Sequence, residues 1–252
     1  MNSLIRQTAG FMRAGMKIAV LTGAGVSAES NIPTFRGKDG WWKNHRPEDM
    51  ATPEAFERNP AFVWEWYGHR QKMIRKCRPN NAHHAIARLE KLFDDFTLIT
   101  QNVDNLHQQA GSRKILELHG NIFKARCMKE GLITDFLLQE EPLPRCGNCG
   151  ALLRPHVVWF GETLDSGVIR SAMEAAINCD LFIVAGTSAM VQPAASLPLY
   201  ARSEGAMVVE INPDPTPISA LVNLSINIPA GEAMPEIADE YERIQKRKHP
   251  PE

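Results

Sequence analysis

The sequence has no long hydrophobic stretch, little net charge and no internal repeat. No apolar run approaches the roughly 20 residues of a membrane-spanning helix, and the first residues, MNSLIRQTAGFMRAG, lack the apolar centre of a signal peptide. Lys and Arg number 28 against 29 Asp and Glu, so the net charge is −1 and no overall field attracts nucleic acid or an anionic membrane. We therefore expect neither a membrane protein nor a nucleic-acid-binding protein.

Cysteine is also scarce, and its pattern is informative. Five cysteines, an odd number with a single C-x-x-C pair, favour a reducing compartment and a metal site over a disulfide framework. The composition is otherwise that of a globular protein, with 44% hydrophobic and 23% charged residues, and 252 residues suffice for a full core. We expect a cytoplasmic protein. The oligomeric state cannot be read from these patterns, and a monomer is the default expectation.

Short apolar runs alternate with helical patterns along most of the chain. The runs that read as strands are 16–22, 96–100, 115–118, 156–160, 180–185, 206–211 and 224–228. The helical patterns cover 2–15, 53–78 with a restart at 59–60, 81–93, 166–178, 193–203 and 233–247. Strands that alternate with helices, with polar or glycine-rich turns at the strand ends, predict an α/β fold built on a doubly wound parallel sheet.

Residues 122–155 interrupt this alternation. They contain cysteines, prolines and glycines but no long periodic run, which indicates a small inserted module. We therefore predict a large Rossmann-like domain formed by about 1–35, 80–121 and 156–252. A small domain would combine a helical insert at 36–79 with the cysteine-containing, zinc-ribbon-like insert at 122–155.

The glycine-rich stretch GAGVSAESNIPTFRG follows the first predicted strand. Gly23, Gly25 and Ala28 fit the pattern G-x-G-x-x-A, whose small residues let the backbone approach a pyrophosphate at the start of a helix. Taken alone, a tight structural turn explains this motif almost as well. The acid that ordinary dinucleotide folds place about 20 residues further on is missing, because PTFRGKDGWWKNHRPED reads as a loop. The ribose must then be held in another way.

Several motifs occur in a characteristic order: GAGVSAESNIPTFRG, TQNVDNLH, ELHG, a cysteine module, FGE, GTS and NPD. In this order they resemble the sirtuins, the family of NAD-dependent protein-lysine deacylases, over about residues 12–240. The resemblance implies NAD as the cofactor and acylated-lysine proteins or peptides as the substrates. It also implies nicotinamide and O-acyl-ADP-ribose as products, together with a free lysine.

The resemblance assigns NAD contacts to the turns that follow the strands. The implied contacts are Gly23, Ala24, Gly25, Ser27 and Ala28 in the first turn, Phe35, Arg36 and Trp42 in the loop behind it, Gln101, Asn102 and Asp104 at the second strand end, and Gly186, Thr187, Ser188, Asn212, Pro213, Asp214 and Ala230 around the adenosine half. Asp104 could accept from a ribose hydroxyl in place of the missing acid. The alternative for Asn102 and Asp104 is a pair of helix N-cap residues, and both roles could hold together.

The resemblance makes His119 the general base and Asn102 its partner in catalysis. The acyl oxygen of the modified lysine would attack C1′ of the nicotinamide ribose. A neutral imidazole would then deprotonate a ribose hydroxyl, a task that suits the usual histidine pKa of about 6.5. A lone histidine after an apolar strand is otherwise most often structural.

Tyr67 and Arg70, in the segment WEWYGHR, carry the prediction of substrate class. Their Y-x-x-R spacing resembles the sirtuin subclass that prefers negatively charged acyl groups, because a guanidinium and a phenol can together bind a carboxylate. The small Ala51 would leave room for a longer acyl chain. The plainer alternative is a pair on the helix surface, with the arginine bound to Glu65.

A second implied substrate contact is the wall of a peptide groove. The resemblance places the extended peptide beside the segment HVVWFGE, with contacts from Val158, Phe160, Gly161 and Glu162. Pairing through the main chain would tolerate many sequences around the lysine.

The metal site departs from the family pattern of two C-x-x-C pairs. Cys146 and Cys149 form the second pair, but the first pair reads Cys127-Met-Lys-Glu130. Three thiolates and the Glu130 carboxylate could hold a structural zinc ion, since carboxylates also bind zinc. The alternative is a module that has lost tight zinc binding and is held by packing.

Two other functions use the same cofactor site. Mono-ADP-ribosyl transfer breaks the same bond of NAD, and a catalytically silent sensor would bind NAD or ADP-ribose without turnover. The presence of both His119 and Asn102 favours deacylation, since transfer needs no base for a ribose hydroxyl.

Overall fold

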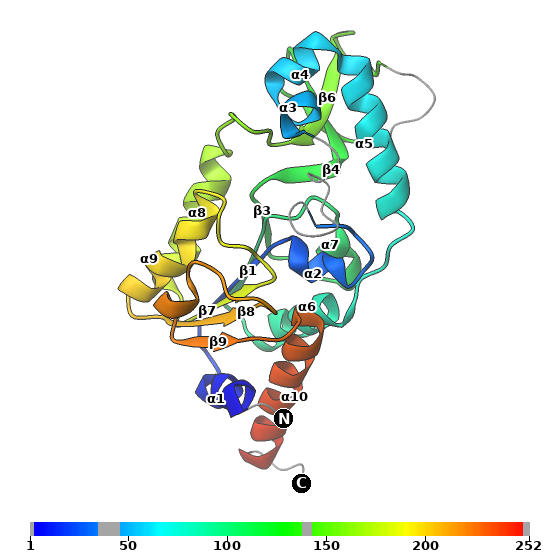
Figure 1. Ribbon diagram of the computed structural model, residues 1–252. Helices are drawn as coiled ribbons and strands as arrows, with labels where there is room; N and C mark the ends of the chain where they lie inside the picture. Colours follow the sequence, from blue (N-terminus) through cyan, green and yellow to red (C-terminus); the bar gives the residue numbers. More distant parts are fainter. Residues whose placement is uncertain (1–2, 35–45, 138–142, 249–252) are drawn as a thin grey trace.

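A six-stranded parallel sheet forms the larger part of the molecule in the computed structural model, which describes residues 3–34, 46–137 and 143–248 (Figure 1). The strands are β1 (Ile18–Thr22), β2 (Phe96–Thr100), β3 (Ile115–Glu117), β7 (Leu181–Ala185), β8 (Met207–Ile211) and β9 (Leu224–Ile226). Their order is β3-β2-β1-β7-β8-β9, and all neighbouring pairs are parallel. The strand order reverses between β1 and β7, and ligands of open α/β sheets bind outside the carboxyl ends at such a point.

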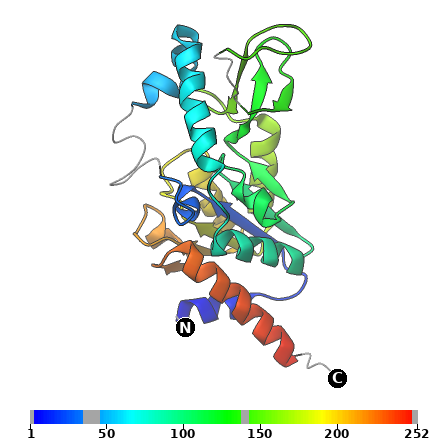
Figure 2. The ribbon, with the colours of Figure 1, turned by 90° about the vertical axis from the view of Figure 1, so that its right-hand side faces the viewer.

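Helices cover both faces of this sheet. Ile18 and Val20 pack in one core with α1 (Ser3–Phe11), α6 (Asn81–Leu92) and α10 (Ala230–Lys248). Ala19 and Leu21 pack in a second core with α8 (Ser166–Asn178) and α9 (Leu197–Ser203), because successive strand residues point to opposite faces. Figure 2 shows α1 beside α10, with both ends of the chain at this end of the molecule. The predicted doubly wound fold is confirmed.

A smaller antiparallel sheet lies at the other end of the molecule. It consists of β5 (Ile133–Asp135), β4 (Gly120–Cys127) and β6 (Leu153–Val157), in that order. The helices α3 (Pro47–Met50), α4 (Pro53–Arg58) and α5 (Pro60–Ile74) gather around it (Figure 1). Two side chains fix α5 to this sheet: Trp64 Nε1 donates to Leu153 O at 2.9 Å and Gln71 Nε2 donates to Ile122 O at 2.6 Å. The division into two domains at the predicted boundaries stays a prediction.

Several elements differ in extent or pairing from the sequence-based expectation, and two of these differences concern the strands next to the site. The strand expected at 156–160 lies at Leu153–Val157 and pairs with β4 rather than joining the parallel sheet. Pro155 suits that place, because a residue without an N–H group is tolerated on an edge strand. The first helix ends at Phe11, and a turn with Gly15 at φ 77° leads into β1.

The remaining elements are short. They are α2 (Ala24–Ala28), α7 (Leu106–Ala110) and the 3₁₀ turns η2 (Ala194–Ser196) and η3 (Ser219–Leu221). All five cysteines are free thiols. Within the described ranges, no helix combines the length and the apolar character needed to cross a bilayer.

Candidate active site

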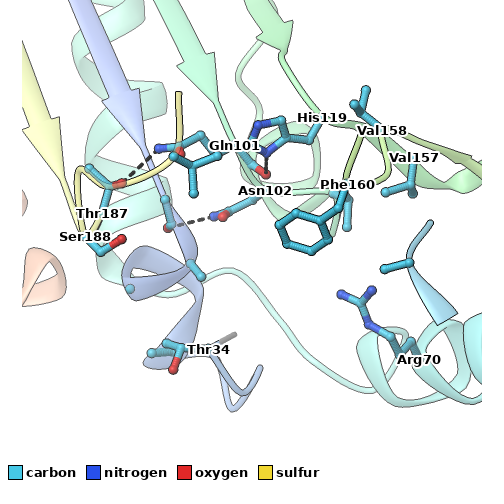
Figure 3. A pocket seen from close by; sticks show the side chains of 18 of the residues that line it. Thr34, Arg70, Gln101, Asn102, His119, Val157, Val158, Phe160, Thr187 and Ser188 are labelled. Atoms are coloured by element: carbon cyan, nitrogen blue, oxygen red, sulfur yellow. Dashed lines mark hydrogen bonds between the residues drawn. The ribbon is translucent and has the colours of Figure 1, made fainter. Parts of the chain in front are cut away.

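A cavity of about 730 Å³ lies at the carboxyl ends of the parallel strands, between them and elements of the smaller sheet (Figure 3). Its size is that of a typical ligand site. The sequence-predicted residues that line it are Gly23, Ala24, Gly25, Ala28, Tyr67, Arg70, Gln101, Asn102, His119, Val158, Phe160, Gly161, Glu162, Gly186, Thr187, Ser188, Asn212, Pro213, Asp214 and Ala230. The structure therefore brings together one set of residues from turns that are far apart in the sequence.

The two glycines of the first turn allow two strand-end turns to touch. Gly23 N donates to Ala185 O at 3.1 Å, and Gly25 N donates to Gly186 O at 2.8 Å. A Cβ atom on Gly25 would lie 2.8 Å from the Gly186 Cα, and one on Gly23 would lie 2.7 Å from the Thr187 Cβ. The turn is thus a tight structural turn that also faces the cavity. Its two glycine N–H groups are used within the fold.

A buried hydrogen-bond chain holds Asn102 against the first turn. Asn102 Nδ2 donates to Gly23 O at 3.0 Å and to Ser27 Oγ at 3.1 Å. The Ser27 hydroxyl in turn donates to Asp104 Oδ2 at 2.6 Å. Because both acceptors face the Asn102 amide nitrogen, its oxygen Oδ1 is the atom left to accept a hydrogen bond from a ligand.

Ser27 and Asp104 lie behind the cavity wall and do not line it. Both are buried, with exposed fractions of 1% and 5%. The Asp104 carboxylate also accepts from Leu106 N at 3.0 Å at the start of α7, as the N-cap alternative predicted. The direct contacts predicted between these two residues and NAD are therefore not supported by this placement. Their contacts position Asn102 instead.

His119 lines the cavity from the turn between β3 and β4. Its Nδ1 lies 3.0 Å from Gln101 O, and since a carbonyl can only accept, Nδ1 carries the hydrogen. The neutral ring then has its lone pair on Nε2. Burial lowers the pKa of His119, and the hydrogen bond to Gln101 O offsets part of this effect. The neutral imidazole is therefore the prevailing form at neutral pH. Figure 3 shows the ring beside Gln101 and Asn102.

Tyr67 and Arg70 are buried in the opposite wall of the cavity. Their exposed fractions are 1% and 3%, so the alternative of an exposed helix-surface pair is wrong. The Arg70 guanidinium lies 4.7 Å from the centre of the Trp66 ring and points into the cavity (Figure 3). The small Ala51 also lines the cavity and belongs to the same hydrophobic cluster as Tyr67. A buried cation at the end of a cavity is an environment for an anionic group.

The loop after β6 is built around an ion pair. Arg154 binds the carboxylate of Glu162 with two nitrogens, one at 2.9 Å from Oε2. Glu162 Oε2 also accepts from Trp159 N at 2.8 Å. Burial alone would raise the pKa of Glu162, but the hydrogen bonds from Arg154 outweigh it and lower the pKa. Glu162 lines the cavity, yet its carboxylate is engaged in holding this loop, a role that the predicted substrate contact did not include.

Several lining residues were missed by sequence reasoning, three of them with large or charged side chains. Glu29, Trp66 and Trp159 face the cavity. Glu29 Oε1 accepts from Gly231 N at 2.8 Å and so ties α2 to the start of α10. All three residues lie inside segments that the sequence had already singled out, but no motif assigned them a contact. Of the predicted contacts, Phe35, Arg36 and Trp42 lie outside the described residues.

The four predicted metal ligands come together away from the cavity. One ligand atom each from Cys127, Glu130, Cys146 and Cys149 lies within 4.8 Å of all the others. The sulfur atoms of Cys127 and Cys149 are 3.6 Å apart, and Cys146 Sγ lies 3.8 Å from Glu130 Oε2. A tetrahedral zinc with Zn–S bonds of about 2.3 Å separates its ligands by roughly 3.8 Å. The cluster therefore fits a zinc ion, and none of its members lines the cavity.

Sequence comparison identifies a family and close relatives. The profile of the Sir2 family matches residues 23–193. NAD-dependent protein deacylase 1 of Caldanaerobacter subterraneus subsp. tengcongensis is 53% identical over 216 residues, which cover 84% of this chain and 89% of the relative. NAD-dependent protein deacylase of Aquifex aeolicus is 49% identical over 228 residues, which cover 89% of this chain and 95% of the relative.

Solved structures give the same result for the fold. A Sir2 homologue in complex with NAD superposes with a TM-score of 0.86 at 46% identity, over 96% of this chain and 93% of that one. The Sir2Af2 protein bound to a myristoylated histone peptide superposes with a TM-score of 0.78 at 36% identity, over 98% of this chain and 100% of the other. The likeness thus spans both sheets and the cavity between them.

Proposed function

The chain belongs to the Sir2 family, and from that membership we propose that it removes succinyl or malonyl groups, and acetyl groups less efficiently, from protein lysines in an NAD-dependent reaction. It is an NAD-dependent protein deacylase, as are the two relatives to which it is 53% and 49% identical. NAD is the cofactor and acylated lysines in peptides or proteins are the substrates. The preference for acidic acyl groups is our proposal for this chain.

The buried cation in the cavity wall carries this proposal. Arg70 is 3% exposed beside Tyr67, and both lie on α5 at the end of the cavity where Ala51 leaves room. Burial lowers the pKa of Arg70, but an arginine starts high enough to stay charged in proteins. Its guanidinium offers a fork of donors to the carboxylate of a succinyl or malonyl group. An acetyl group has no such acceptor, so it gains nothing from this cation.

The other half of the cavity fits NAD. Asn102 Oδ1 is an acceptor for a ribose hydroxyl, and His119 Nε2 is a base beside it. The strand-end turns at 186–188 and 212–214 line the part of the cavity next to Ala230 and would hold the adenosine half. NAD supplies the bond between nicotinamide and ribose, whose cleavage drives the reaction and leaves the acyl group on ADP-ribose. The protein contributes the orientation of the ribose and the transfer of one hydroxyl proton to His119.

The peptide would lie along the loop after β6. In that loop the N–H groups of Val158 and Phe160 already donate to His119 O at 3.0 Å and Ala51 O at 2.9 Å. These two bonds fix the loop between the general base and the acyl end of the cavity. Pairing with an extended peptide would therefore use backbone groups of the loop other than these two N–H groups. Such pairing depends on the backbone of the substrate peptide and therefore tolerates many side chains.

A series of matched peptides tests the acyl preference. We expect kcat/KM for succinyl-lysine and malonyl-lysine peptides to exceed that for the acetyl-lysine peptide of the same sequence, measured with NAD at pH 7.5. A glutaryl peptide extends the series by one methylene and reports the depth of the pocket. Equal or higher efficiency with the acetyl peptide would contradict the proposal.

We also propose that Glu130 is the fourth ligand of a structural zinc ion. The protein purified without added zinc should then contain about one zinc per chain. Glu130→Ala should weaken zinc retention against a chelator by roughly tenfold or more, since even partners of metal ligands contribute 10- to 100-fold. Glu130→Cys, which restores four thiolates, should retain zinc at least as well as the wild type.

The control for the metal prediction is an acid that is outside the cluster. Asp135 is exposed on β5, and Asp135→Asn should leave zinc retention unchanged. Equal retention in Glu130→Ala and in the wild type would show that Glu130 is no ligand. If the purified protein contained no zinc, the alternative of a module held by packing alone would be favoured.

Cytoplasmic location and a monomeric state remain part of the proposal.

A further inference from the structure

A hydrogen bond between two side chains connects the acyl end of the cavity to the loop after β6. Trp159 Nε1 lies 2.9 Å from the Tyr67 phenol oxygen, and both side chains are buried, with exposed fractions of 3% and 1%. An indole N–H can only donate, so the phenol oxygen accepts this bond. The hydrogen of the phenol must then point elsewhere.

Among the described residues, none accepts the phenol hydrogen. In the described part of the chain, Trp159 is the one hydrogen-bond partner of the Tyr67 side chain, whose ring also contacts the Trp66 ring and the Arg70 guanidinium. Both of those groups lie at the cavity, and neither offers an oxygen to receive the hydrogen. Burial raises the pKa of Tyr67, so the phenol keeps its hydrogen at neutral pH. A buried donor without an acceptor is costly, and a ligand that brings one removes the cost.

The indole ring that makes this bond is held firmly in place. The Arg154 guanidinium stacks 3.5 Å from the centre of the Trp159 ring, and the Phe56 ring packs 5.3 Å away. Arg154 is itself fixed by Glu162 and by a bond from its Nη2 to Val157 O at 2.9 Å. The Trp159 backbone N–H is bound to Glu162 as well, at 2.8 Å. The direction of the indole N–H is therefore set by the loop, before any substrate arrives.

We propose that Trp159 is a positioning residue for acyl specificity. Its indole N–H occupies the accepting side of the Tyr67 phenol and so directs the phenol hydrogen into the cavity. There Tyr67 and Arg70 together bind the carboxylate of an acidic acyl group. This inference rests on the proposed preference for acidic acyl groups. The bond from Trp159 also polarises the phenol and makes it a better donor. An acetyl group has no acceptor at this point, so the arrangement acts on the acidic substrates alone.

The ratio of two activities measures this role. The measured quantity is kcat/KM for a succinyl-lysine peptide divided by kcat/KM for the matched acetyl-lysine peptide. Trp159→Phe keeps an aromatic ring but removes the N–H donor, and it should lower this ratio by about 5- to 10-fold, the effect of one hydrogen bond. Most of the loss should appear in KM for the succinyl peptide. Tyr67→Phe removes the phenol and should lower the ratio at least as much.

A double-mutant cycle separates positioning from packing. If Trp159 acts through the Tyr67 phenol, Trp159→Phe should have no further effect on the ratio in the Tyr67→Phe background. The matched control is Phe56→Leu, which loosens the packing on the same indole ring and keeps its N–H; it should lower both activities by similar factors. If Trp159→Phe melts at a much lower temperature, Arg154→Lys, which weakens the support of the indole, should still lower the ratio in the same direction.

Three results would overturn the inference. In the first, Trp159→Phe lowers both activities equally. In the second, it lowers the ratio as much in the Tyr67→Phe background as in the wild type. In the third, the wild type prefers succinyl peptides and Arg70→Met abolishes that preference, but Trp159→Phe leaves the ratio unchanged. A wild type with no succinyl preference would instead refute the proposed function, and this inference with it.

Discussion

Replacement of His119 by alanine should lower the rate of peptide deacylation by about 10²- to 10⁴-fold, the usual contribution of a general base. The cause is the loss of the Nε2 lone pair, which Gln101 O leaves free by binding the hydrogen on Nδ1 at 3.0 Å. Binding of NAD should change little, because the strand-end turns that would hold the adenosine half are untouched. The exchange of labelled nicotinamide into NAD, which precedes the step at His119, should fall far less than deacylation.

The control and the pH profile make this prediction specific. His69 is exposed on α5, and His69→Ala should keep wild-type activity. Burial lowers the pKa of His119, so the neutral base forms at a lower pH than for an ordinary histidine. The acidic limb of the kcat/KM profile should therefore lie below pH 6.5, the usual histidine value, with activity rising as the pH rises through it. A limb above pH 7, or deacylation that survives in His119→Ala, would remove His119 from the mechanism.

Replacement of Arg70 by methionine should change the substrate preference more than any other substitution. Truncating one member of a buried charge pair costs about 2 to 5 kcal/mol, so kcat/KM for the succinyl peptide should fall by roughly 30-fold to several thousand-fold. Deacetylation should fall much less, because the acetyl group makes no ion pair. Methionine has a similar length and can fill the space beside Trp66, which limits the change in packing.

Two further variants test whether the forked guanidinium of Arg70 is the cause of the preference for acidic acyl groups. Arg70→Lys keeps the charge but loses the planar fork, so it should recover only part of the desuccinylation. Arg75 is exposed beyond the end of α5, and Arg75→Met should have wild-type activity on both substrates. An equal loss of both activities in Arg70→Met would mean that Arg70 supports the fold of the small sheet and its helices, and not the acidic substrate.

The sequence predicted the parallel sheet well because its strands are short, mostly apolar runs without alternating polar residues. β1, with IAVLT, is buried at all five positions, and the helices on both faces follow from that pattern. The predicted strand at 156–160 begins three residues after the observed one, Leu153–Val157. Arg154 and Pro155 were interpreted as the segment that leads into the strand, but they belong to it. Whether a short strand joins a parallel sheet or a separate antiparallel one depends on contacts with β4 that no local pattern encodes.

The site was predicted by motif, and its internal connections were not. Gly25 and Asn102 were identified from the sequence, but Ser27 and Asp104 proved to be buried behind them, where they hold the Asn102 amide. The motif contains all of these residues without stating which of them faces the cavity. Trp159 was part of a predicted wall, yet its bond to Tyr67 joins positions 92 residues apart. Such side-chain pairs exist only once the chain is folded.

The products of one reaction test the central claim most directly, which is that one cavity joins the NAD ribose, the base His119 and the cation Arg70. A succinyl-lysine peptide incubated with NAD and the protein should yield nicotinamide, free-lysine peptide and O-succinyl-ADP-ribose in equal amounts by mass spectrometry. A peptide that gains ADP-ribose would indicate ADP-ribosyl transfer, and an unchanged peptide would indicate a silent binding module. Either of these outcomes would contradict the account.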